Sequence, residues 1–176
     1  MNMAYKKYIY LVLVPLAIFL KGCSYSFTGA SVPPHLNSIA IIDFKDKSGS
    51  GEPELRDKFT SELIQNFLDD NTLFVTEKEN ADALLECTVT SIKDAPDIVS
   101  QNDQDGGESI SSRRLTITVK VMYRDMVKRK TIFDKQFSDY SNYQTDEDPF
   151  AARQTAIDDT ITKICEDILL GVVSNW

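Results

Sequence analysis

Seven basic residues gather in one stretch of an otherwise acidic chain, and these side chains have the clearest potential for binding chemistry. They are Arg113, Arg114, Lys120, Arg124, Lys128, Arg129 and Lys130. Arginine presents a planar fork of N–H donors that fits phosphate and carboxylate oxygens. The candidates for binding an anion are Arg113, Arg114, Lys120 and Arg124. A second interpretation stays open, in which these charges only solvate a sheet face and discourage pairing with other chains.

Catalytic chemistry is poorly supported by the residue types. His35 is the only histidine, and it lies in a proline-rich stretch where we expect a solvated linker residue. A serine or cysteine nucleophile would therefore lack a histidine base. Acidic pairs such as Asp69-Asp70 and Asp158-Asp159 are expected at helix ends and on helix surfaces, where solvated charge explains them better than glycoside hydrolysis does. We predict a protein that is not an enzyme.

Metal and nucleotide sites are also weakly indicated. Oxygen ligands cluster between Asp97 and Glu108, but their spacing does not match the twelve-residue calcium loop. The stretch from Lys45 to Gly51 lacks the Gly-Lys-Ser/Thr ending of a phosphate-binding loop. We predict no metal and no cofactor.

The amino terminus has the three parts of a secretory signal. Lys6 and Lys7 precede an apolar run of about a dozen residues, which is too short to cross a membrane that needs roughly 20. The run ends in Leu20-Lys21-Gly22-Cys23, which resembles the lipobox of bacterial lipoproteins. That resemblance implies cleavage before Cys23 and modification of Cys23 by a diacylglyceryl thioether and an amide-linked acyl chain such as palmitate. Several acyl chains hold a protein firmly at a membrane. An ordinary secreted chain and an uncleaved signal anchor remain the alternatives.

This interpretation divides the chain into residues 1–22 as a signal peptide, 23–36 as the lipidated cysteine with its spacer, and 37–176 as a single domain. The leader removes three of the 19 basic residues and no acidic one, which leaves 16 against 27 and a net charge of about −11. An acidic surface argues against a general binder of nucleic acids or of anionic lipids. Cys87 and Cys165 sit among apolar neighbours and are predicted to be core residues, with a bond between them as the alternative.

Hydrophobic periodicity predicts the elements that must position these side chains. Residues 38–44 form a β-branched apolar run, typical of a central strand buried on both faces. Apolar residues recur at every fourth position over 54–68 and at helical spacing over 149–173, which predicts two amphipathic helices. Strict alternation predicts strands over 83–92 and 114–124, and a further strand is expected over 130–140. Residues 73–75 are a candidate for one more short strand.

The stretch from Ala95 to Ser112 is acidic and glycine-containing, with almost no large apolar residues. Such a segment cannot bury enough surface to order itself, so we expect a mobile hairpin loop there. The order strand, helix, several strands, helix predicts an α+β two-layer sandwich, with two helices packed on one face of a four-stranded, mostly antiparallel sheet. The opposite sheet face is then polar and available, and it carries Arg114, Lys120 and Arg124.

Several motifs together resemble the LptE family of lipopolysaccharide-assembly lipoproteins. They are Gly22-Cys23-Ser24-Tyr25-Ser26-Phe27-Thr28-Gly29, the strand Ile39-Ala40-Ile41-Ile42-Asp43-Phe44, the helix from Leu55 to Leu68, and the stretch from Glu79 to Val89 containing Ala81-Asp82-Ala83. The resemblance implies an outer-membrane lipoprotein that faces the periplasm, supports an LptD-type β-barrel and helps lipopolysaccharide reach the outer leaflet. It also implies lipopolysaccharide as a ligand, for which the four basic candidates would supply phosphate contacts.

A rival resemblance belongs to another class. The strand 39–44 followed by Ser48-Gly49 is similar to lipoproteins that activate peptidoglycan synthases or form curli-type secretion pores. A pore subunit should offer an amphipathic membrane hairpin, and residues 95–112 are too acidic and glycine-rich for one. A synthase activator therefore remains the stronger form of this alternative.

Overall fold

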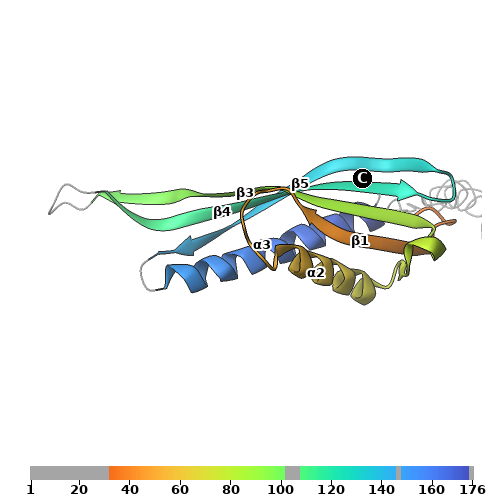
Figure 1. Ribbon diagram of the computed structural model, residues 1–176, viewed down its shortest axis with the longest axis horizontal. Coiled ribbons are helices and arrows are strands. Elements are labelled where there is room, and N and C mark those ends of the chain that lie inside the picture. The colour runs from red at the N-terminus through yellow and green to blue at the C-terminus, as the bar shows by residue number, and fades with distance from the viewer. Residues whose placement is uncertain (1–31, 102–107, 146–147, 175–176) are drawn as a thin grey trace, which may run out of the picture.

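The computed structural model describes residues 32–101, 108–145 and 148–174, with the backbone alone described at 98–101 and 108–111. The predicted signal peptide and Cys23 lie outside the described residues. Two helices, α2 (Leu55–Asp70) and α3 (Pro149–Val173), cover one face of a single sheet, as Figure 1 shows. The predicted two-layer α+β architecture with both helices on one face is confirmed.

The sheet has five strands in the order β2-β1-β3-β4-β5, so the prediction of four strands is wrong. They are β1 (Ser38–Asp46), β2 (Phe74–Val75), β3 (Ala83–Gln101), β4 (Glu108–Asp125) and β5 (Lys130–Gln144). The sheet is also mixed, because β1 runs parallel to both β2 and β3 while β3, β4 and β5 are antiparallel. The reason is α2, which carries the chain back to the starting end of β1, as a crossover between parallel strands must.

Helix α2 has the predicted apolar stripe. Leu55, Phe59, Leu63 and Phe67 are all buried, and the Phe59 ring stacks on Phe44 of β1 with 4.8 Å between ring centroids. The helix ends where Asn71 adopts a left-handed conformation and its N–H donates to the Phe67 carbonyl. Asparagine tolerates this conformation better than most residues, so it is a common stop signal.

Helix α3 has the predicted bounds. The Asp148 carboxylate accepts the Ala151 N–H at 3.1 Å, and Pro149 occupies the first turn, where its missing N–H costs nothing. Eight residues form its buried face: Ala156, Ile157, Thr160, Ile161, Ile164, Cys165, Ile168 and Val172. An apolar stripe is a local signal, which is why the sequence located this helix.

The prediction of a mobile loop over 95–112 is wrong for most of that stretch. Strand β3 continues to Gln101 and β4 begins at Glu108, and residues 102–107 lie outside the described residues. The hairpin extends beyond the helices at one end of the molecule (Figure 1). Backbone pairing between adjacent strands does not require apolar side chains, so composition alone underestimated the hairpin's length.

The polypeptide before β1 is part of the packed body. Leu36 is buried in the core, and Val32 packs against it. His35 is not a solvated linker residue, and that prediction is wrong, because its Nε2 atom lies 2.6 Å from the Oδ2 atom of Asp125 at the end of β4. Sequence distance hid this contact, since the two residues are 90 positions apart.

Candidate functional site

The four basic candidates are divided between the two faces of the sheet. Leu115 and the other odd-numbered residues of β4 through Tyr123 are buried beneath the helices. Alternation therefore places Arg114, Lys120 and Arg124 on the opposite face, which the helices leave uncovered. Arg113 lies on the helix-facing side and takes no part in the outer surface. The structure thus brings together three of the four candidates on one face.

A shallow hollow lies on this outer face near one end of the sheet. It has a volume of about 170 Å³, and its lining residues are Lys45, Glu86, Thr88, Lys120, Met122 and Arg124. Lys45 belongs to β1, and its register opposite Thr88 of β3 brings it to this face. Three cations from two strands therefore surround a single carboxylate at the hollow. Lys45 was not among the predicted residues because the pairing of β1 with β3 is invisible in the sequence.

The cations around the hollow are paired only loosely. Lys120 Nζ lies 3.1 Å from Asp134 Oδ2, with both side chains more than 40% exposed. Arg124 Nη2 lies 3.4 Å from Glu86 Oε2, and its side chain is 43% exposed. Exposed ion pairs of this kind contribute about 0–1 kcal/mol. An incoming phosphate could therefore replace these carboxylates at small cost.

Arg114 is held more firmly, further along the same face. Its Nη2 atom lies 2.7 Å from Asp97 Oδ1, and its Nε–H donates to Asn142 Oδ1 at 3.1 Å. The guanidinium also stacks over the Tyr140 ring, 4.4 Å from the ring centroid. Ten residues of β4 separate Arg114 from Arg124, about 34 Å at strand rise. The outer cations form a strip along β4, and one small anion cannot contact both of its ends.

Arg113 belongs to a half-buried polar cluster between the sheet and α3, which we call the Asp94 cluster (Asp94, Arg113, Tyr143, Arg153 and Glu52). Asp94 accepts hydrogen bonds from Arg113 Nε at 2.7 Å, Tyr143 Oη at 2.7 Å and Arg153 Nε at 3.2 Å. Burial raises the pKa of Asp94, but these hydrogen bonds outweigh it and the pKa falls below its ordinary value. Asp94 therefore stays ionised where the hairpin meets the helix.

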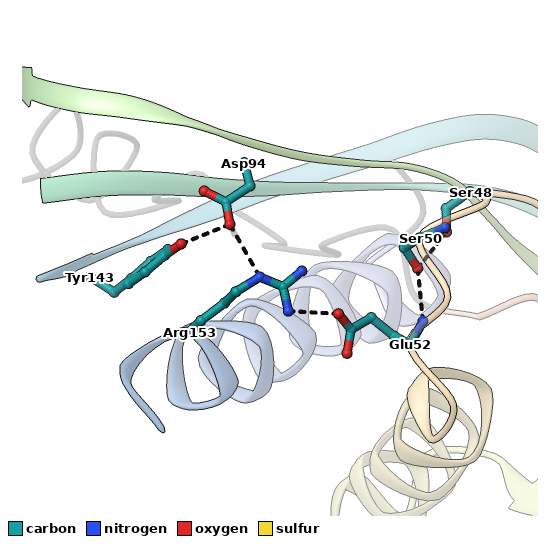
Figure 2. Close-up of polar contacts among 6 residues, drawn as sticks. All are labelled: Ser48, Ser50, Glu52, Asp94, Tyr143 and Arg153. Atoms are coloured by element: carbon teal, nitrogen blue, oxygen red, sulfur yellow. Dashed lines mark hydrogen bonds and ion pairs between the residues drawn. The ribbon is translucent and has the colours of Figure 1, made fainter. Parts of the chain in front are cut away.

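Arg153 connects the same cluster to the loop that follows β1. Its Nη1 atom lies 2.6 Å from Glu52 Oε1, while its Nε–H points to Asp94, as Figure 2 shows. The Ser50 hydroxyl accepts the Glu52 N–H at 3.4 Å and a hydrogen bond from Ser48 at 3.0 Å (Figure 2). Together with Arg113, this network joins five separate parts of the chain. The sequence pattern did not reveal it because Arg153 and Glu52 are 101 positions apart.

At the other end of the sheet, two aspartates tie the chain before β1 to the strands. Asp82 Oδ2 accepts the Asn37 N–H at 3.0 Å and the Ser38 hydroxyl at 3.0 Å. The backbone donation from Asn37 and the hydroxyl of Ser38 lower the pKa of Asp82. Asp125 contacts His35 and also accepts the Lys128 N–H at 2.7 Å. The aspartate of the Ala-Asp-Ala motif thus holds the starts of β1 and β3 together.

The two remaining cysteines are buried free thiols in the core, as the main prediction held. Burial raises the pKa of both Cys87 and Cys165. Neither thiol is therefore suited to act as a nucleophile.

Two observations bear on metal binding and membrane insertion. Within residues 32–97, 112–145 and 148–174, side chains of histidine, cysteine, aspartate and glutamate form no group of three that could hold a metal ion. In the part of the chain that the structure describes, neither helix combines the length and apolar composition needed to cross a bilayer.

Comparison with known proteins gives both a family match and structural matches. The model of the LptE lipopolysaccharide-assembly family matches residues 36–170. No curated protein matches the sequence. Three solved structures share the fold at low sequence identity.

The hypothetical protein CT253 from Chlamydia trachomatis is 9% identical, with a TM-score of 0.56 over 78% of this chain and 95% of that one. Protein XCC0632 from Xanthomonas campestris is 11% identical, with a TM-score of 0.58 over 82% and 90%. A minor lipoprotein from Acinetobacter baumannii is 11% identical, with a TM-score of 0.53 over 80% and 94%.

Proposed function

The chain belongs to the LptE family of lipopolysaccharide-assembly proteins, and from that premise we propose that it is a lipoprotein of the outer membrane, anchored through Cys23 and facing the periplasm. In this proposal it supports an LptD-type β-barrel and binds lipopolysaccharide on the outer face of its sheet. It acts by contact and catalyses no reaction. The observation that carries the proposal is the family match over residues 36–170, which spans nearly all of the packed body.

The anchor is supported by the leader and its Leu-x-Gly-Cys ending. The A. baumannii protein of the same fold is named a lipoprotein. Val32 already packs against the hydrophobic core, so only residues 24–31 lie between Cys23 and the packed domain. Acyl chains on Cys23 would hold the body at the membrane surface without a spanning helix.

Binding of lipopolysaccharide is supported by the hollow on the outer sheet face. Lys45, Lys120 and Arg124 converge there, and lipopolysaccharide carries phosphate groups for which arginine and lysine are suitable donors. The carboxylate partners of Lys120 and Arg124 are exposed enough to be displaced. Arg113 is left out of this proposal because its guanidinium is held by Asp94 on the other side of the sheet.

Charge reversal on the outer face tests the binding proposal. We expect Lys120→Glu with Arg124→Glu to weaken lipopolysaccharide binding by the mature chain in mild detergent by about a hundredfold, because each of the two charged hydrogen bonds contributes about 1.5 kcal/mol. Lys58→Glu is the control for charge, since Lys58 is also ion-paired and partly exposed but lies on α2. It changes the net charge by two units, where the double variant changes it by four, so a loss of half the binding free energy lost by the double variant would show that only net charge matters.

Co-purification tests the partner separately. The lipidated chain, extracted from membranes in mild detergent, is expected to bring down a large β-barrel identified by mass spectrometry. Recovery of a penicillin-binding protein in its place would favour the peptidoglycan-synthase activator and overturn the barrel proposal.

A further inference from the structure

The turn between β4 and β5 combines exposed apolar side chains with consecutive cations. Met126 is 39% exposed and Val127 is 57% exposed. Lys128, Arg129 and Lys130 follow directly, and all three are exposed. Apolar side chains beside basic ones are the composition that binds a membrane interface, where the first enter the headgroup layer and the second contact lipid phosphates.

Hydrogen bonds hold the β4–β5 turn in a defined conformation. The Asp125 carboxylate accepts the Lys128 N–H at 2.7 Å, and Arg129 has a positive φ of 53°. The Met126 N–H donates to the Asp82 carbonyl at 2.8 Å, which ties the turn to the start of β3. The Met126 and Val127 side chains are therefore presented from a rigid base.

The link to the proposed anchor reaches the body at this same turn. His35 contacts Asp125 at the base of the turn, with 2.6 Å between Nε2 and Oδ2. Nine residue steps separate Cys23 from Val32, so an extended link spans at most about 30 Å. The body is longer, since the 18 residues of β4 alone extend about 60 Å. An acyl anchor at Cys23 must therefore keep this end of the body near the membrane.

The negative charge of the rest of the surface favours the basic β4–β5 turn as the part that contacts an anionic membrane. The mature chain carries a net charge of about −11, so most of its surface is repelled by an anionic membrane. At this end Phe74 is a further exposed apolar residue, 67% accessible at the start of β2. The acidic residues Glu77 and Glu79 follow it, and β2 lies on the other side of β1 from the turn. The contact is therefore centred on the β4–β5 turn, with β2 further from the lipid.

We propose that residues 126–130 are a membrane-docking element that inserts Met126 and Val127 into an anionic phospholipid surface, with Lys128, Arg129 and Lys130 on the lipid phosphates. The proposal rests on the proposed acylation of Cys23 for the orientation of the body. The β3–β4 hairpin lies at the far end of β4 from this turn, so docking at the turn leaves the hairpin free of the docked surface.

Site-specific fluorescence on the full mature, lipidated chain tests the proposal. Val127→Cys carries an environment-sensitive label in vesicles of phosphatidylethanolamine and phosphatidylglycerol, and Phe150→Cys at the start of α3 is the matched control. Phe150 is even more exposed, at 73%, but lies at the opposite end of the helix layer. Cys87 and Cys165 are buried and do not compete for the label. Quenching by spin-labelled lipid is expected at position 127 and not at position 150.

Two further experiments test whether the cations of the turn contribute to docking. Lys128→Glu with Lys130→Glu is expected to lower the ratio of inserted to free turn by about tenfold or more, because each cation near an anionic surface contributes about fivefold. Vesicles of phosphatidylcholine alone should reproduce that loss. Intact mass establishes first whether Cys23 is acylated, so failure of the anchor is seen separately. If Cys23 is acylated, equal quenching at positions 127 and 150 overturns the docking element. So does quenching at position 127 that is unchanged both in the Lys128→Glu, Lys130→Glu variant and in phosphatidylcholine vesicles.

Discussion

Asp94→Ala is the most informative single substitution, because one carboxylate holds donors from two strands and one helix. It removes the acceptor of Arg113, Arg153 and Tyr143 together. Hydrogen bonds to a charged group contribute about 1.5–3 kcal/mol each. The two arginines are about a quarter exposed and can rehydrate in part, and Arg153 keeps Glu52. Tyr143 is buried and loses its acceptor. We expect a loss of about 2–4 kcal/mol in the free energy of unfolding.

Urea denaturation followed by circular dichroism measures this loss, on the chain from Ser24 onward, which retains every described residue. At about 2–4 °C per kcal/mol for a chain of this size, the melting temperature should fall by roughly 5–15 °C. Asp97→Ala is the matched control, since Asp97 lies on the same strand and pairs with an arginine, but Arg114 is 43% exposed. Its expected cost is about 1 kcal/mol or less. If the two variants lose equal stability, the Asp94 cluster is not the junction that we infer.

Three further results are expected. Backbone N–H donors just before and at the start of β1 lower the pKa of Asp82 below 3.8. The ionised carboxylate therefore stabilises the fold above about pH 4, and this stabilisation is lost as the pH falls further. Urea titrations should show that Asp82→Asn destabilises the protein at pH 7 and much less at pH 2. Burial raises the pKa of the Cys87 and Cys165 thiols, so intact mass should show no maleimide addition at pH 7 in the folded chain and two additions in urea; rapid labelling without urea would contradict their burial. Thr160 is buried, and its hydroxyl donates to the Ala156 carbonyl of its own helix. Thr160→Val should therefore change the free energy of unfolding, measured in urea, by no more than about 1 kcal/mol. A larger loss would mean that the hydroxyl has a further role.

Local sequence patterns were sufficient to predict the helices and most of the strands, but not how these elements are arranged in space. The apolar stripe predicted a helix from near Pro149 to about Val173, which agrees with the bounds of α3, and alternation predicted the inward face of β4. The hairpin was underestimated because backbone pairing orders polar strands. The parallel position of β1 was missed because it follows from where α2 returns the chain.

The sequence by itself determined the periodicities, the family, and the presence of many cations on an acidic chain. Only the tertiary structure decided which carboxylate each cation meets. It paired Arg113 with Asp94 on the helix-facing side, left Lys120 and Arg124 on an open face, and brought His35 to Asp125 beside the β4–β5 turn. The physical reason is that periodicity relates residues only two positions apart in a strand and three or four apart in a helix. Ion pairs and hydrogen bonds act over about 3 Å in space between residues that are separated by up to a hundred positions in the chain.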